Sequence, residues 1–164
     1  MLNLWGSILL IAAGMFAGFK ASEMYKHKLV LHKKLLRMYS EAAILLEYSL
    51  MTYGEMIEYF RQSGEYTDFS FLNVNAAAYD IRQAVLDKID DWDCGLEDAA
   101  LNNLKSFFTT LGTTNIQGQL SYARLAAVQQ QKMIDSVEKL YSQRSHICRT
   151  FGVLGGAFAA IMLI

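Results

Sequence analysis

The sequence contains no proline, and only five of its glycines lie between Lys20 and Thr150. Proline and glycine are the residues that most often interrupt helices, so a long chain with few of them favours helical structure. Alternation of apolar and polar residues nowhere persists for more than a few positions, and β-strands would require it. The sequence therefore predicts an all-α fold.

Both ends of the chain lack charged side chains, because all 15 Lys and Arg residues and all 16 Asp and Glu residues lie between Lys20 and Arg149. Leu2 to Phe19 is an uncharged run of 18 residues, which is near the lower limit for a helix that crosses a bilayer. No basic residues precede this run, as they would in a cleaved signal peptide. We expect transmembrane helices at residues 1–19 and 148–164, with a helical domain at residues 20–147 between them.

Charge is distributed unevenly along the domain between these runs. Residues 20–40 carry six cations and one acid, and residues 101–150 carry six cations and two acids. Residues 41–100 carry thirteen acids and three cations. The positive-inside rule then predicts a cytoplasmic central domain, with both termini on the far side of the membrane. Basic residues beside a membrane span favour lipid headgroups over nucleic acid as their partner.

Apolar residues at steps of three and four run from Leu35 to Phe60 and predict one long helix to about Phe60. Further helices are expected at residues 72–90 and 96–109, and a last helix feeds directly into the C-terminal apolar run. Gly112 is expected to end the third helix in the left-handed conformation. Thr113, Thr114 or Asn115 is expected to cap the last helix.

Each apolar run contains small residues four positions apart: Gly14 and Gly18 in the first run, Gly152 and Gly156 in the second. This spacing lets helix backbones approach closely in lipid. It predicts a specific helix contact, either between the two spans or between protomers. Contact between protomers would make the protein a homo-oligomer.

The segment DDWDCG, at residues 90–95, has the glycine position of a calcium-binding loop. Trp92 and Cys94 occupy positions where that loop needs oxygen ligands, so the segment predicts an acidic surface turn and no metal site. Such a turn can bind a basic partner by electrostatic complementarity. We expect a partner surface on five acidic residues: Asp90, Asp91, Asp93, Glu97 and Asp98.

Other polar residues show no pattern typical of chemistry. His27, His32 and His146 lack metal-binding spacing, and His27 and His32 are expected to contact water or lipid headgroups. The patch at residues 129–131, three glutamines, is expected to be a solvated helix face. Phosphate-binding loops and catalytic triads do not occur in the sequence, which predicts no catalytic residue and no cofactor. Cys94 and Cys148 do not predict a disulfide, because the cytoplasm keeps thiols reduced.

The layout as a whole resembles the stage III sporulation protein AB family of spore-forming Firmicutes. Residues 44–60 are similar to the family's Leu-Glu-x-Glu-Ile-x-Tyr stretch, with Ser49 in place of the second glutamate. Residues 106–120 are similar to its Phe-Gly-x-x-Leu-Gly-x-x-Asp-x-x-x-Gln segment, with Phe108 and Asn115 as departures. The glycine-rich ending is also similar. The matching residues are Glu47, Tyr53, Phe107, Leu111, Gly112 and Gln119.

This resemblance implies a setting that the residue patterns alone do not supply. The family's soluble part is similar to the cytoplasmic domains of the platform protein in type II secretion and type IV pilus machines. Family members act in the mother cell, at the outer forespore membrane, in the channel complex that links mother cell and forespore. The analogy implies a cytoplasmic secretion-type ATPase, the sporulation protein AA, and other membrane subunits as partners.

The sequence thus predicts a non-enzymatic membrane platform subunit that docks a motor protein. Neutralising Asp90, Asp91 and Asp93 is expected to weaken that docking more at low salt than at high salt. One alternative is a helical interaction protein unrelated to secretion, whose apolar ends pair as a buried hairpin. Another is a membrane enzyme with a site between the spans, but the uncharged runs at residues 2–19 and 151–164 contain no ionisable residue, which such a site would need.

Overall fold

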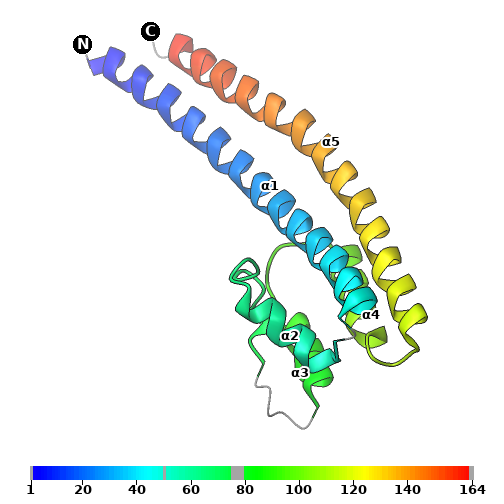
Figure 1. The fold of residues 1–164 in the computed structure, drawn as a ribbon. Helices are drawn as coiled ribbons and strands as arrows, with labels where there is room; N and C mark the ends of the chain where they lie inside the picture. Colours follow the sequence, from blue (N-terminus) through cyan, green and yellow to red (C-terminus); the bar gives the residue numbers. More distant parts are fainter. Residues whose placement is uncertain (1, 50, 75–79, 163–164) are drawn as a thin grey trace. The chain divides into compact units, whose positions relative to one another are not determined.

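The computed structural model describes the backbone of residues 2–49, 51–74 and 80–162, and the side chains of Glu23 and of residues 26–49, 51–74 and 80–140. All regular structure in these ranges is helical (Figure 1), which confirms the all-α prediction. The elements are α1 (Leu2–Tyr48), α2 (Tyr53–Gln62), the 3-10 helix η1 (Ser70–Leu72), α3 (Ile81–Asp90), α4 (Asp98–Thr110) and α5 (Ile116–Met162).

The chain divides into two compact units. One comprises Met1–Leu29 and Asp135–Ile164, and so contains the first part of α1 and the last part of α5. The other, which we call the central unit, comprises Val30–Ile134. The central unit contains α2, η1, α3 and α4 together with the adjoining parts of the two long helices.

Among the residues whose side chains the structure describes, no helix is both long enough and apolar enough to cross a membrane. The apolar runs at residues 1–19 and 148–164 lie outside those residues, and the two spans stay predictions. The same holds for the packing expected of Gly14, Gly18, Gly152 and Gly156.

The prediction of one continuous helix to about Phe60 is wrong, because α1 ends at Tyr48 and α2 begins at Tyr53. A capping box at Thr52 starts the second helix. The Thr52 hydroxyl accepts a hydrogen bond from the backbone N–H of Glu55, and the Glu55 carboxylate accepts one from the backbone N–H of Thr52, at 2.8 Å. These bonds satisfy backbone N–H groups at the start of the helix that have no acceptor within the helix itself.

The later elements follow the sequence more closely. The helix expected at 72–90 begins only at Ile81, where the Asp80 carboxylate accepts a hydrogen bond from the backbone N–H of Gln83. The helix expected at residues 96–109 is α4, which spans Asp98–Thr110. Gly112, just after its end, has the predicted left-handed conformation, with φ +77°. Of the candidate caps for α5, Asn115 accepts a hydrogen bond from the backbone N–H of Gly118 at 2.8 Å.

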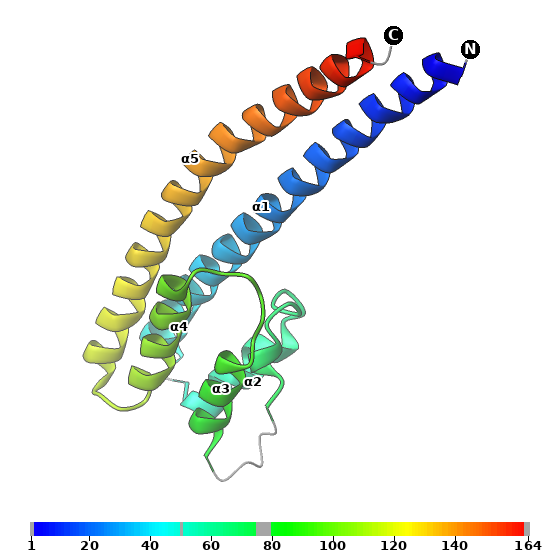
Figure 2. The same cartoon turned by 180° about the vertical axis from the view of Figure 1, so that it is seen from behind.

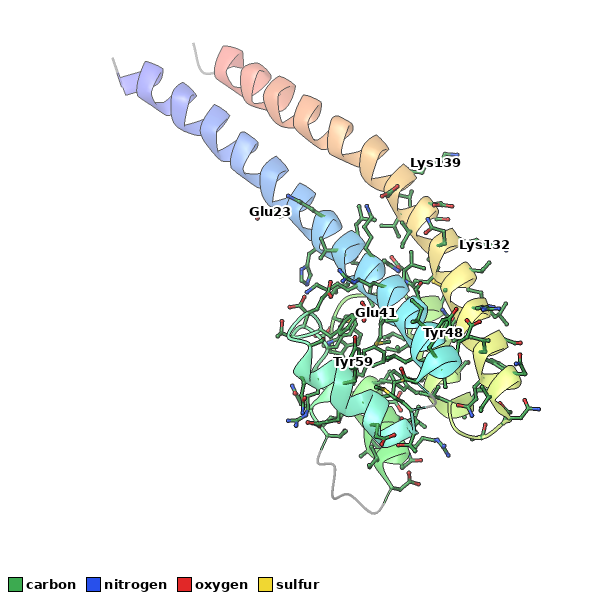
Figure 3. The ribbon with its side chains drawn as sticks, viewed as in Figure 1. Glu23, Glu41, Tyr48, Tyr59, Lys132 and Lys139 are labelled. Carbon is green, nitrogen blue, oxygen red and sulfur yellow. The ribbon has the colours of Figure 1, made fainter. Side chains whose placement is uncertain are left out.

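Aromatic side chains form much of the core of the central unit. Their rings meet in a continuous series of edge-to-face and stacked contacts, with centroids 4.9 to 5.6 Å apart for the pairs that join α1, η1, α4 and the segments between them. Each such pair contributes about 0.5–1.5 kcal/mol beyond the area that it buries. Figure 3 shows that side chains fill the space among the helices of the central unit. The core residues in the series are Tyr39, Tyr66, Phe69, Phe71, Trp92, Phe107 and Phe108.

Candidate functional site

The acidic segment, residues 90–98, joins α3 to α4 as the predicted turn. Trp92 fixes this segment to the core, since its ring is buried and packs edge-to-face against Phe69 and Phe71 at 5.4 and 5.1 Å. Gly95 has φ +69°, a left-handed conformation that glycine adopts without steric cost. The segment that carries the acidic residues is therefore anchored to the core through Trp92.

The five predicted partner-surface residues divide into two groups. Asp90 forms an ion pair with Lys105 of α4, and Glu97 Oε2 lies 3.0 Å from His32 Nε2 of α1. These two carboxylates connect elements of the fold. The side chains of Asp91, Asp93 and Asp98 are exposed, and within the described part of the chain they have no ion-pair partner. All five residues are exposed, and three of their carboxylates are also without an ion-pair partner among the described residues. That a partner binds them stays a prediction.

His32 corrects an expectation from the sequence. It was expected to contact water or lipid headgroups, but its side chain is fully buried. Gln130 Nε2 of α5 donates to His32 Nδ1 at 2.7 Å and to the His32 backbone oxygen at 3.3 Å. With Nδ1 accepting, the ring proton lies on Nε2, which donates it to Glu97. The imidazole therefore joins α1, α5 and the residue before α4.

The glutamine patch needs a similar correction, because only part of it is a solvated face. Gln129 and Gln131 are exposed, whereas Gln130 is fully buried against His32. A second buried amide also joins two helices: Asn103 Nδ2 of α4 donates a hydrogen bond to the backbone oxygen of Ala126 in α5 at 3.1 Å. Removing either partner of a buried hydrogen bond leaves an unsatisfied polar group, which costs about 1–3 kcal/mol.

Three of the residues that carry the family resemblance meet in the turn between α4 and α5. The backbone N–H of Gly112 donates to Gln119 Oε1 at 2.9 Å, and Gln119 Nε2 donates to the backbone oxygen of Thr114 at 2.7 Å. The Gln119 side chain thereby closes the turn from within α5. Leu111, the residue before Gly112, is buried in the core. These residues shape the turn.

Arg82 of α3 holds this turn against the rest of the central unit. Its Nη2 atom donates to the backbone oxygen of Leu111 at 3.0 Å, and its guanidinium carbon lies 5.3 Å from the centre of the Tyr53 ring. A Cβ atom on Gly112 would lie 3.2 Å from Arg82 Nη2 and 3.7 Å from Tyr53 Cβ. We call this arrangement of Tyr53, Arg82, Leu111 and Gly112 the Arg82 clasp. No pattern in the sequence marks Arg82 for these contacts.

Glu47 and Phe107 are the other two residues that carry the family resemblance, and they also make contacts between helices. Glu47 Oε2 of α1 accepts a hydrogen bond from Arg124 Nη2 of α5 at 2.9 Å. Phe107 of α4 packs edge-to-face on Tyr39 of α1, with ring centroids 4.9 Å apart. The matched residues thus make contacts that hold the helices of the central unit together.

Buried tyrosines have perturbed acidities that follow from their surroundings. Burial raises the pKa of Tyr39 and of Tyr53 well above the ordinary phenol value, although the positive charge of Arg82 opposes the shift at Tyr53. Burial, together with the hydrogen bond to Glu41, also raises the pKa of Tyr66. These hydroxyls stay protonated at neutral pH. In the part of the chain that the structure describes, no group of three or more His, Cys, Asp and Glu side chains is arranged to hold a metal ion.

Fold and contacts together define an all-α protein in which two long helices pack with four shorter helical elements around an aromatic core. The chain matches the family model described as stage III sporulation protein AB over residues 3–164. It belongs to this family, as its sequence resemblance indicated, and the assignment implies a role in sporulation. No curated protein and no solved structure matches the chain.

Proposed function

We propose that the protein is a non-enzymatic membrane platform subunit of the channel complex between mother cell and forespore. Its central unit docks a cytoplasmic secretion-type ATPase, the sporulation protein AA. Family membership supports the sporulation setting. The partner ATPase binds and hydrolyses ATP, since this sequence contains no phosphate-binding loop.

The observation that carries the docking proposal is the division of the acidic segment. Asp90 and Glu97 are engaged within the central unit, whereas Asp91, Asp93 and Asp98 are exposed on a segment that Trp92 fixes to the core. Carboxylates on a segment that is anchored to the core bind a basic surface at a smaller entropic cost than carboxylates on an unanchored loop. The partner surface on the ATPase is then rich in Lys and Arg.

The proposed membrane arrangement rests on the sequence. The segments at residues 1–19 and 148–164, which carry no charged side chain apart from Arg149, span the outer forespore membrane. The central unit faces the mother-cell cytoplasm, with both termini on the far side. Basic residues next to the spans contact lipid headgroups. The glycine pairs Gly14 with Gly18 and Gly152 with Gly156 contact other membrane subunits of the complex.

A binding assay between the full chain and the co-expressed ATPase tests the docking surface. The triple variant Asp91→Asn, Asp93→Asn, Asp98→Asn should bind at least tenfold more weakly at low salt, with a smaller difference at high salt. A control variant neutralises three exposed carboxylates elsewhere: Asp87→Asn, Asp135→Asn and Glu138→Gln. Equal weakening by both variants would show that only net charge matters, and unchanged binding by the triple variant would refute the proposed surface.

Membrane fractionation tests the anchoring independently of the ATPase. The full chain should sediment with membranes, resist extraction by high salt and alkaline buffer, and be released by detergent. A chain that stays in the supernatant without detergent would contradict the two spans and would support the buried-hairpin alternative.

A further inference from the structure

The acidic segment is attached to the rest of the central unit at three points. Asp90 forms an ion pair with Lys105 of α4, and Trp92 is buried in the core. Glu97 Oε2 accepts a hydrogen bond from His32 Nε2 of α1 at 3.0 Å. These attachments determine where the segment presents its exposed carboxylates. The carboxylates of the proposed docking surface lie between these points or directly after the last of them: Asp91, Asp93 and Asp98.

The attachment through His32 joins a surface carboxylate to a buried side chain. The Asp90 and Lys105 side chains are 59% and 37% exposed, and ion pairs exposed to this degree contribute little to stability. The Glu97 side chain is 52% exposed, whereas the His32 side chain is fully buried. Displacing Glu97 would leave the buried Nε2–H of His32 without an acceptor, and this cost opposes its release.

Glu97 occupies the N-cap position of α4 without capping that helix. Its backbone is extended, with φ −72° and ψ 149°, and its side chain makes no capping hydrogen bond. An N-cap side chain ordinarily accepts a hydrogen bond from a backbone N–H in the first turn. The Glu97 carboxylate instead binds α1, 65 positions earlier in the sequence. Within the central unit α4 lies against α1, behind it in Figure 1 and in front of it in Figure 2, and this bond joins the start of α4 to α1.

Gln130 of α5 fixes which ring nitrogen of His32 donates. Its Nε2 atom donates to His32 Nδ1 at 2.7 Å, so the ring proton lies on Nε2 and points toward Glu97. A carboxylate has about four lone-pair sites, and His32 occupies one of those of Glu97. The half-exposed Glu97 carboxylate can therefore bind a cation at the surface while it stays bonded to His32.

We propose that His32 is a positioning residue of the docking surface: it holds the Glu97 carboxylate where it binds a Lys or Arg side chain of the ATPase. This inference rests on the docking function proposed above, and it adds Glu97 to the three exposed aspartates. The bound partner is then joined through Glu97 and His32 to α1, and through Gln130 to α5. Holding a charged group in its bound position lowers the entropic cost of binding. Loss of the bond from His32 therefore weakens docking although no charge on the surface changes.

Two substitutions of His32 separate its bond to Glu97 from its bond to Gln130. In His32→Gln the side-chain nitrogen replaces imidazole Nε2 and can donate to Glu97, but no atom replaces Nδ1. In His32→Asn the side-chain oxygen replaces Nδ1 and can accept from Gln130, but no atom reaches Glu97. Each variant keeps one of the two hydrogen bonds. If His32 served only to stabilise the fold, the two variants would therefore behave alike.

The binding assay between the full chain and the co-expressed ATPase compares these variants at low salt. His32→Asn should bind about threefold to tenfold more weakly than the wild type, whereas His32→Gln should bind within about twofold of it. The matched control is Asn103→Ala, which removes a buried hydrogen bond between α4 and α5 away from the acidic segment and should bind like the wild type.

Hydrogen exchange of the backbone N–H groups of residues 93–97, measured without ATPase, tests the positioning itself. Exchange should be faster in His32→Asn than in the wild type, and unchanged in His32→Gln and Asn103→Ala, because only the first variant frees the end of the segment for local opening. If circular dichroism shows that His32→Asn loses helicity, Glu97→Gln replaces it. Its amide oxygen still accepts from His32 but the charge is lost, so docking should weaken while exchange stays as in the wild type.

The outcomes separate this inference from the docking function on which it rests. A wild-type chain that does not bind the ATPase would refute both. Wild-type binding that is unchanged in a folded His32→Asn, or in Glu97→Gln, would refute the inference alone. Equal weakening by His32→Asn and His32→Gln would also refute it, because His32 would then act through the stability of the fold.

Discussion

The Gly112→Ala substitution tests whether the Arg82 clasp stabilises the central unit. A residue with a Cβ pays about 1–2 kcal/mol to adopt the left-handed conformation that Gly112 has, with φ +77°. The new Cβ would also lie 3.2 Å from Arg82 Nη2, so the guanidinium must move away from the Leu111 oxygen that it now binds at 3.0 Å. Weakening that half-exposed, charged hydrogen bond adds about 1 kcal/mol. The free energy of unfolding should fall by about 2–3 kcal/mol.

Gly64→Ala supplies a control that isolates the contact with Arg82. Gly64 has φ +70°, nearly the same conformation, but a Cβ there would meet no atom within 4 Å. Its substitution should cost only the conformational part, about 1–2 kcal/mol. Urea unfolding of the full chain, followed by far-UV circular dichroism, compares the two variants. Equal losses of stability for Gly112→Ala and Gly64→Ala would refute the reasoning, because the clasp would then contribute nothing.

Three further predictions follow from buried or capping groups, each checked by the same unfolding measurement. Tyr39→Phe should raise stability by up to about 1 kcal/mol, since the buried hydroxyl has no hydrogen-bond partner among the described residues; a clear loss would reveal a partner. Gln130→Leu leaves His32 Nδ1 buried without a donor, which costs about 1–3 kcal/mol, but it also removes Gln130 Oε1, which is buried without a partner among the described residues. Stability should therefore fall by about 1 kcal/mol, and a gain in stability would contradict the role of the network. The hydrogen bonds from Thr52 lower the pKa of Glu55. The stabilisation from this cap is therefore present above the ordinary value of 4.5 and is lost as the pH falls through the lowered pKa. Thr52→Ala should lower the free energy of unfolding by about 1 kcal/mol at neutral pH, and the difference between the variant and the wild type should shrink in acid.

Local signals in the sequence were sufficient for much of the fold. The absence of proline indicated an all-α chain, Gly112 marked the end of α4, and Asn115 was one of three named caps for α5. The capping box of Thr52 and Glu55 was equally visible. The prediction of one continuous helix did not take this box into account, because the apolar spacing continues in steps of three and four across the break between α1 and α2. The position of a helix end therefore depended on capping chemistry more than on periodicity.

Contacts between distant residues explain what the sequence analysis missed. His32 and Gln130 are 98 positions apart, and each alone is typical of a solvated helix surface. Only the approach of α1 to α5 shows that Gln130 Nε2 reaches His32 and that the two side chains are buried together. The same applies to Asp90 and Glu97, whose partners Lys105 and His32 come from other helices. A count of acidic residues cannot separate carboxylates that hold the fold from those that remain exposed.

Site-specific photo-crosslinking in sporulating cells tests the central claim most directly. A photoreactive amino acid at Asp93, exposed within the acidic segment, should form a covalent adduct with the sporulation protein AA. The same probe at Tyr59 of α2, which lies outside that segment, should form none with this ATPase. An ATPase adduct at Tyr59 together with none at Asp93, in cells where both variants accumulate at the membrane, would contradict the account.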